Sequence, residues 1–207
     1  MKKIILTLLL TAGALGLTHA NEWKSTKQSN GVEIYTKEVP GTALKAFKGV
    51  TRVKASMSSL IAMIEDIPEY KNWMYNIKTS NVVGETTTQN GVVYVVQKAP
   101  IITDRDICFE YKVSRSGDSV QVEFHEKPNG VPSTDYVRVQ YFRGMFKLTP
   151  KGSDVEVVYE VAADPGGSVP SSVANTMAVD IPFTTLSNIH TKVNLAKYEG
   201  KNRYRYN

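Results

Sequence analysis

The chain has 207 residues, of which 42% are hydrophobic and 22% are charged. This composition is typical of a globular domain and excludes a disordered, collagen-like or disulfide-scaffold protein. The 25 Lys and Arg residues outnumber the 20 Asp and Glu residues only slightly, to a formal charge of +5. They form no dense basic stripe, so we expect no nucleic-acid partner. The single cysteine excludes an internal disulfide.

The first 20 residues show the three parts of a secretory signal peptide. Met1-Lys2-Lys3 is a short positive start, residues 4–17 form an almost unbroken apolar run, and residues 18–20 end in a small residue. The apolar run is too short for an ordinary membrane span, although a retained N-terminal anchor is the alternative. Cleavage near Ala20 predicts that the mature protein is periplasmic or secreted.

The rest of the chain shows no linker, internal repeat or low-complexity tract. We therefore expect one domain over residues 21–198 and a monomer. A polar tail over residues 199–207 is expected to fray.

The start of this domain predicts a short helix at residues 22–29 and strands at residues 32–38 and 44–54, with a turn at Asn30-Gly31. A helical insertion follows. Ser56 is a favourable N-cap for it, and one face of the helix carries an apolar stripe that includes Leu60, Ile61, Met63 and Ile64.

Pro68 is expected to end this helix, and residues 69–74 predict a further helical turn. From residue 77 the apolar pattern has a period of two, which predicts antiparallel strands joined by short turns. These strands are expected at residues 77–87, 92–97, 106–114, 120–124, 136–148 and 155–163.

Two features inside this run predict local geometry. Gln89-Asn90-Gly91 and Ser116-Gly117-Asp118 predict hairpin turns. The alternation slips near Arg143-Gly144, which predicts a β-bulge.

Residues 169–197 predict one long helix, because apolar residues recur every three to four positions along it. Ser171 or Ser172 is the expected N-cap, and Pro182 is expected to kink the helix. A sheet with one apolar face needs a cover, and only this helix is long enough to supply it. The pattern therefore predicts an α+β fold, in which a curved antiparallel sheet wraps around the C-terminal helix and leaves an apolar cavity between them.

Three stretches carry a resemblance to a known family: residues 68–74 (PEYKNWM), residues 105–109 (RDICF), and residues 155–170 with the helix that follows. In this order and spacing the chain resembles the START (StAR-related lipid-transfer) domain family, as an exported bacterial member. The resemblance covers nearly the whole mature chain. It implies a helix-grip fold that holds a single lipid in a closed tunnel.

The chain departs from the sterol-binding members, which often carry a charged pair inside the cavity. The position six residues after Arg105 is Tyr111, and the strand at residues 92–97 offers no carboxylate. A phospholipid, a fatty acid or another apolar ligand therefore remains open.

The candidate lipid-binding residues share an inward strand position or an apolar helix face. Ordinary core packing is the alternative for each of them. They are Arg105, Phe109, Tyr111, Phe124, Tyr141, Tyr159, Met177 and Ile181.

Two segments have competing interpretations. Arg105 either holds a ligand headgroup or forms a structural ion pair with Asp104 or Asp106. The apolar loop at residues 99–103 either opens as a lid that touches a membrane or packs against its neighbours.

Neither catalysis nor a metal site is indicated. His125 and His190 have no partner at the spacing of metal ligands, and Cys108 is expected to be an unreactive thiol. Glu65-Asp66 and Glu110 do not form a convincing acid–base pair. We expect no cofactor. We expect a non-catalytic protein that binds a lipid or other hydrophobic ligand and transfers it through transient contact with membrane surfaces. One alternative is a helix-grip enzyme, similar to a cyclase or hydrolase, that acts on a hydrophobic substrate. Another is an interaction module whose cavity has collapsed.

Overall fold

The computed structural model describes residues 22–39 and 45–199. The predicted signal peptide and residues 200–207 of the predicted tail lie outside the described residues, so the expectations about them stay predictions.

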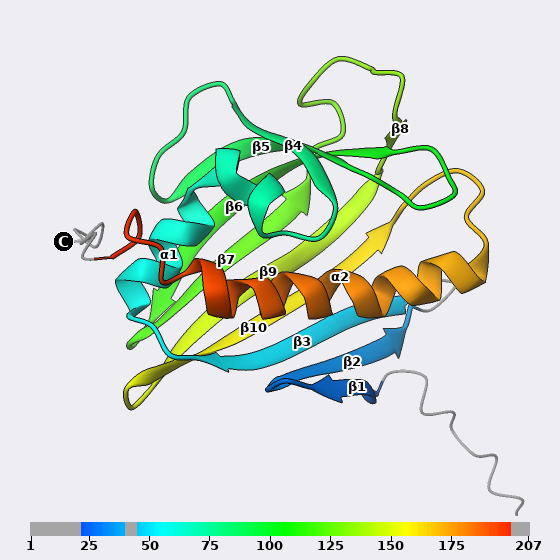
Figure 1. The fold of residues 1–207 in the computed structure, drawn as a ribbon. Helices are drawn as coiled ribbons and strands as arrows, with labels where there is room; N and C mark the ends of the chain where they lie inside the picture. The colour runs from blue at the N-terminus through cyan, green and yellow to red at the C-terminus, as the bar shows by residue number, and fades with distance from the viewer. Residues whose placement is uncertain (1–21, 40–44, 200–207) are drawn as a thin grey trace, which may run out of the picture.

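The described strands form one large sheet in the order β1-β2-β3-β10-β9-β7-β6-β5-β4, with antiparallel neighbours throughout (Figure 1). A short additional strand, β8, pairs parallel to β6. The strands are β1 (Lys24–Ser29), β2 (Val32–Glu38), β3 (Lys45–Val53), β4 (Ile77–Val83), β5 (Asn90–Gln97), β6 (Arg105–Ser116), β7 (Ser119–Glu126), β8 (Val137–Arg138), β9 (Tyr141–Lys151) and β10 (Asp154–Asp164).

The helices are α1 (Met57–Glu65), the 3₁₀ helix η1 (Ile67–Asn72) and α2 (Ser171–Lys192). Helix α2 lies across the concave face of the sheet, and α1 lies near the end of α2 (Figure 1). The predicted fold class, a curved antiparallel sheet with a long C-terminal helix, is therefore confirmed. Within the described ranges, no helix is both long and apolar enough to span a membrane.

Helix α1 begins as predicted, because the Ser56 hydroxyl accepts a hydrogen bond from the Ser59 backbone N–H at 3.1 Å. The prediction for α2 is wrong at both ends. Pro170 stands at the N-cap position and no side chain caps the helix, and the helix ends at Lys192 rather than at residue 197.

Several local predictions in the sheet are wrong. Residues 24–29 form the edge strand β1 instead of a helix, because they pair with β2. Asn90-Gly91 lies inside β5, paired with β6, and the chain turns earlier, near Gly84. The expected bulge at Arg143-Gly144 is absent, since the register of β9 with β10 runs unbroken through both residues.

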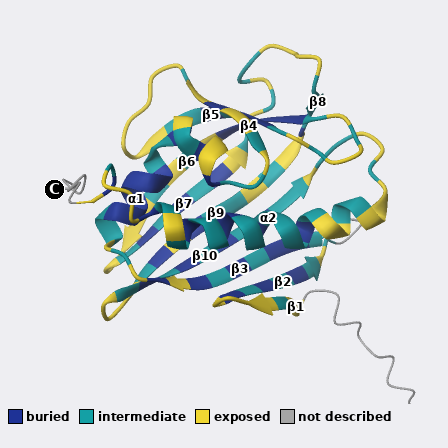
Figure 2. Ribbon diagram, in the orientation of Figure 1, coloured by how far each residue is buried: buried dark blue, intermediate teal, exposed yellow. Residues whose placement is uncertain are grey.

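The core lies between the concave face of the sheet and α2, where buried residues concentrate (Figure 2). Helix α2 approaches the sheet closely at Gly49 in β3. A Cβ atom there would lie 2.5 Å from Leu186 Cδ1 and 3.2 Å from Pro182 Cβ. The absence of a side chain at Gly49 therefore lets the middle of α2 pack directly on the sheet.

Candidate functional site

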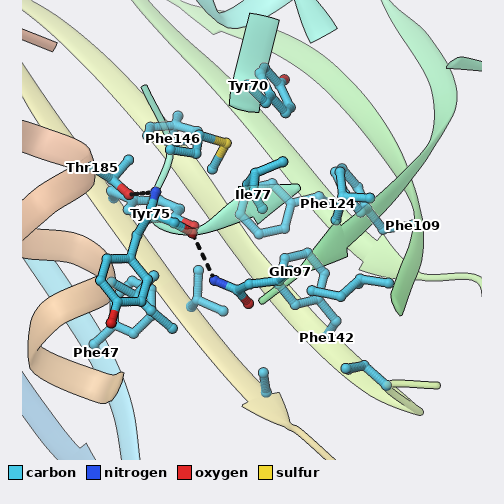
Figure 3. A pocket seen from close by; sticks show the side chains of 18 of the residues that line it. Phe47, Tyr70, Tyr75, Ile77, Gln97, Phe109, Phe124, Phe142, Phe146 and Thr185 are labelled. Carbon is cyan, nitrogen blue, oxygen red and sulfur yellow. Dashed lines mark hydrogen bonds between the residues drawn. The ribbon is translucent and has the colours of Figure 1, made fainter. Parts of the chain in front are cut away.

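A cavity of about 160 Å³ lies between α2 and the concave face of the sheet. The whole hollow, counted together with the open solvent at its mouth, has a volume of about 1450 Å³. Its wall is mainly apolar and includes phenylalanine rings from four strands (Figure 3). These are Phe47, Phe109, Phe124, Phe142 and Phe146.

Four of these rings, those of Phe109, Phe124, Phe142 and Phe146, form a contiguous cluster. Phe142 stacks on Phe124 with ring centroids 5.1 Å apart and contacts Phe109 at 5.2 Å. An apolar wall with a few polar groups at defined places is typical of a site for a hydrophobic small molecule.

The first half of α2 forms one wall through Ala174, Met177, Ala178 and Ile181. Met177 is half-buried, whereas Tyr159 and Phe146 at the opposite end are buried. The cavity is therefore more accessible near the start of α2 than near α1.

Seven of the eight predicted lipid-binding residues line this cavity: Arg105, Phe109, Tyr111, Phe124, Tyr159, Met177 and Ile181. Tyr141 does not. It is 38% exposed at the start of β9, and its neighbour Phe142 lines the cavity instead. The bulge that we expected at residues 143–144 explains this error. A bulge there would turn Tyr141 toward the cavity, whereas the unbroken strand turns Phe142 toward it.

Arg105 borders the cavity, and its guanidinium forms no ion pair with either neighbouring aspartate. It is 4% exposed and donates hydrogen bonds to the backbone carbonyls of Thr103, Pro165 (3.2 Å) and Gly166 (3.1 Å). Asp104 instead pairs with Lys78. Arg105 thus fastens the loop before α2 to β6, and burial lowers its pKa, with Asp104 acting in the opposite direction.

Asp106 lies on the opposite face of β6, in a buried polar network. Arg138 donates to both of its carboxylate oxygens at 2.9 Å, and Thr134 and Tyr94 donate to Oδ2 at 2.7 and 3.1 Å. Burial alone would raise the pKa of Asp106, but these hydrogen bonds and the Arg138 charge hold it below its usual value. The network ties the segment at residues 128–138 to the outer face of the sheet.

Tyr75 and Gln97 also line the cavity, and the sequence pattern did not predict either of them there. The Tyr75 backbone N–H donates to Thr185 Oγ1 on α2 at 3.1 Å, and the Gln97 side-chain amide donates to the Tyr75 carbonyl at 3.1 Å (Figure 3). These bonds link α2, the segment after η1 and β5 along one wall. Tyr75 lies in an irregular segment, where periodicity carries no orientation signal.

Glu65, Tyr70 and Tyr159 line the cavity on the side of α1 and η1, the α1 end of the cavity. The Tyr70 hydroxyl donates to the Ile64 carbonyl at 2.6 Å. Burial raises the pKa values of both tyrosine hydroxyls, so they are neutral across the physiological range.

The cysteine and the histidines of the described residues lie outside the cavity wall. Cys108 is fully buried on the outer side of β6, and burial raises the pKa of its thiol. His125 is exposed, and His190 Nε2 contacts Thr51 Oγ1 at 2.8 Å. Within residues 22–39 and 45–199, no cluster of His, Cys, Asp and Glu side chains could hold a metal ion.

The model of the START domain family matches residues 13–188. The chain belongs to the START domain family. Members of this family bind hydrophobic ligands. The match begins inside the segment predicted as a signal peptide, so the domain boundary at residue 21 stays a prediction.

Two bacterial proteins are similar to this START domain over most of their length. An uncharacterized protein of Pseudomonas aeruginosa is 30% identical over 198 residues, which cover 92% of this chain and 98% of that protein. The crystal structure of a STAR-related lipid transfer protein from Xanthomonas axonopodis matches with a TM-score of 0.77 and 28% identity, over 83% of this chain and 98% of that chain.

Two further solved structures share the fold alone. Human STARD10 has a TM-score of 0.71 at 18% identity, over 83% of this chain and 72% of that chain. The di-domain ARO/CYC protein BexL has a TM-score of 0.51 at 9% identity, over 74% and 52%. The fold therefore does not by itself separate a carrier from an enzyme.

Proposed function

We propose that this START domain binds one lipid or similar hydrophobic ligand in the cavity beneath α2 and carries it between membrane surfaces without covalent chemistry. The observation that supports the proposal is the apolar cavity itself, with its wall of phenylalanine rings. Transfer of an acyl chain from water into such a site is favourable by about 0.8 kcal/mol per CH₂ group.

A long-chain ligand needs more room than the cavity offers inside its walls. An apolar cavity of about 150 Å³ holds a molecule the size of benzene, and this cavity measures about 160 Å³. Binding a lipid therefore requires one wall to move. The first half of α2 is the wall best suited to moving, because none of its side chains hydrogen-bonds to another described element.

Filling the cavity tests the proposal. Ala163 lines the cavity at the end of β10, and its neighbour Ala162 has the opposite strand parity and is not part of the wall. We expect native mass spectrometry after incubation with a lipid extract to show a bound lipid on the wild type and on Ala162→Phe, and little on Ala163→Phe. A wild type that stays empty, or an Ala163→Phe variant that binds normally, would contradict the proposal.

Contact with a membrane is proposed for the loop at residues 99–103. Ile101 at its tip is 95% exposed and has a φ of 70°, a conformation that β-branched residues rarely adopt. An apolar side chain held in water by a strained backbone suits insertion into a bilayer.

The substitution Ile101→Asn tests this contact, because Asn tolerates a positive φ and lacks the apolar side chain. We expect slower lipid transfer between donor and acceptor vesicles, with thermal stability unchanged or raised. The control is Val82→Asn, which replaces another exposed apolar residue, on β4. Equal slowing by both variants would contradict a specific role for the loop.

An enzyme is the second candidate, favoured by the carboxylate of Glu65 and the hydroxyls of Tyr70 and Tyr159 at the α1 end. Because both tyrosines are neutral, neither provides a base at neutral pH. Comparing the mass of each ligand before binding and after release separates the two functions. An unchanged ligand supports a carrier, and a consistent change in mass supports an enzyme.

We also propose that the protein is exported, as the first 20 residues predict. N-terminal sequencing of the protein recovered from the extracytoplasmic fraction is expected to begin near residue 21. A protein retained in the cytoplasm with an intact N-terminus would contradict export.

A further inference from the structure

The Tyr159 hydroxyl is a polar group at the cavity wall that forms no hydrogen bond within residues 22–39 and 45–199. The residue is 3% exposed. Its ring stacks face to face on Phe146, with centroids 4.2 Å apart and 4° between the planes, and meets Phe47 edge-on at 5.2 Å. Because two aromatic neighbours fix the ring, the position of the hydroxyl is fixed as well.

The groups around Tyr159 mainly accept hydrogen bonds. The Tyr70 hydroxyl has committed its proton to the Ile64 carbonyl at 2.6 Å, so its oxygen can only accept a further bond. The Glu65 carboxyl group belongs to the same wall, and a carboxyl oxygen can accept hydrogen bonds in either protonation state. Tyr159 and Glu65 both influence the pKa of Tyr70, after the larger effect of burial, so the three groups lie within electrostatic reach of one another.

We propose that the α1 end binds the hydroxyl group of an otherwise apolar, neutral ligand, and that Tyr159 is the hydrogen-bond partner that selects this group. This inference rests on the proposed function and names its ligand class. A ligand hydroxyl can accept a bond from Tyr159 and donate one to an acceptor beside it. A hydrocarbon end would leave the Tyr159 hydroxyl buried without a partner.

An acidic headgroup fits this end of the cavity poorly. A ligand carboxylate would be buried in an apolar region beside the Glu65 carboxyl group and the acceptor-only oxygen of Tyr70, which disfavours its charged form. The inferred orientation therefore places the hydroxyl against α1 and the apolar body along Met177 and Ile181.

Three short probes that differ only in their polar end test the inference: octan-1-ol, its methyl ether and octanoate. Their affinities for the delipidated full chain are measured by displacement of a fluorescent apolar probe. For the wild type we expect the alcohol to bind about tenfold more tightly than the ether, which corresponds to one additional hydrogen bond. Octanoate is expected to bind more weakly than the alcohol.

Tyr159→Phe removes only the hydroxyl, and Tyr141→Phe is the matched control on a tyrosine outside the cavity. We expect Tyr159→Phe to bind the alcohol and the ether equally, with the ether affinity unchanged, and Tyr141→Phe to keep the wild-type preference. An equal affinity of the wild type for both probes, or an undiminished preference in Tyr159→Phe, overturns the inference and leaves the carrier function standing.

The lipids retained from an extract give a second measurement, which does not depend on the variant. Hydroxyl-bearing neutral lipids are expected to predominate on the wild type. Retention of lipids without a free hydroxyl overturns the ligand class alone, whereas failure to bind either the probes or any lipid overturns the proposed function as well.

Discussion

The two halves of α2 contact the rest of the protein in different ways. In residues 171–181, Ala178 is the only residue that is buried, and no side chain hydrogen-bonds to another described element. In residues 182–192, Thr185 accepts from Tyr75, Asn188 donates to the Trp73 carbonyl at 2.9 Å, and His190 contacts Thr51. One half is thus a cavity wall, and the other half is an anchor.

The anchor continues beyond the helix. Lys197 lies 2.7 Å from a Glu69 carboxylate oxygen and 3.3 Å from one of Asp66, and the Tyr198 hydroxyl donates to Asp66 at 3.1 Å. Pro182 stands at the boundary between the two halves, where its missing N–H removes one helical hydrogen bond. The difference between the two halves indicates that the start of α2 can move while its end stays attached.

The largest expected difference between the halves is in stability. Leu186 in the anchored half is fully buried, so Leu186→Ala is expected to lower the free energy of unfolding by about 2–5 kcal/mol. Met177→Ala in the first half is expected to cost less than about 1 kcal/mol, because Met177 already borders empty space. Urea denaturation measures both free energies of unfolding. Equal losses in the two variants would contradict the difference between the two halves of α2.

Crowding the contact between α2 and β3 is expected to have the next largest effect. The Cβ of Gly49→Ala would lie 2.5 Å from Leu186 Cδ1 and must displace it, at a cost of about 1–3 kcal/mol. The control is Arg52→Ala, an exposed position on the same strand, expected within about 0.5 kcal/mol of the wild type. A stable Gly49→Ala variant would show that α2 moves more easily at Leu186 than its contacts indicate.

Removing one polar contact of the anchored half is expected to have a smaller effect. Thr185→Val keeps the shape of the side chain but removes the acceptor of the Tyr75 N–H, and we expect a loss of about 1 kcal/mol and faster hydrogen exchange at Tyr75. Thr184→Val changes a half-buried neighbour that forms no such bond. Similar exchange in both variants would argue against a tether at Thr185.

The smallest expected effect is a dependence on pH in the anchored half. Thr51 Oγ1 donates to the Gly31 carbonyl at 2.8 Å, so it accepts from His190 Nε2–H. Burial lowers the pKa of His190 below its usual 6.5. As the pH falls, His190 is therefore protonated in the unfolded chain before it is protonated in the folded protein. Its contribution to the free energy of unfolding is complete above pH 6.5 and decreases until the pH has passed its folded pKa.

Urea denaturation between pH 5 and pH 8 measures this slope. We expect His190→Gln to reduce it and His125→Gln, at an exposed position on β7, to leave it unchanged. A wild type whose stability is constant across this range would contradict the role of His190.

The sequence predicted the parts of the fold that a repeating pattern encodes. The alternation at residues 155–163 identified β10, and the shared parity of Arg105, Phe109 and Tyr111 correctly placed three side chains at one cavity. The pattern failed where a distant partner decides the structure. The polar segment at residues 24–29 is a strand only because β2 pairs with it.

The α1 end of the cavity was beyond prediction for a similar reason. Tyr159 was identified from its strand, but Glu65 and Tyr70 belong to α1 and η1, whose placement over the sheet is a matter of tertiary packing. Tyr141 was misplaced because Gly144 mimics a slip in the alternation. There Gly accommodates the Phe124 ring, whose Cε2 would lie 2.6 Å from a Cβ.

The adjacent residues Arg105 and Asp106 act on opposite sides of the same strand. One holds the loop that leads into α2, and the other holds the segment at residues 128–138 through Arg138. A shift of β6 by a single residue would place a carboxylate among the carbonyls on the inside and a guanidinium beside Arg138 on the outside. A misaligned pairing is thereby penalised by charge during folding, in addition to the cost of moving the apolar side chains of β6 out of the core.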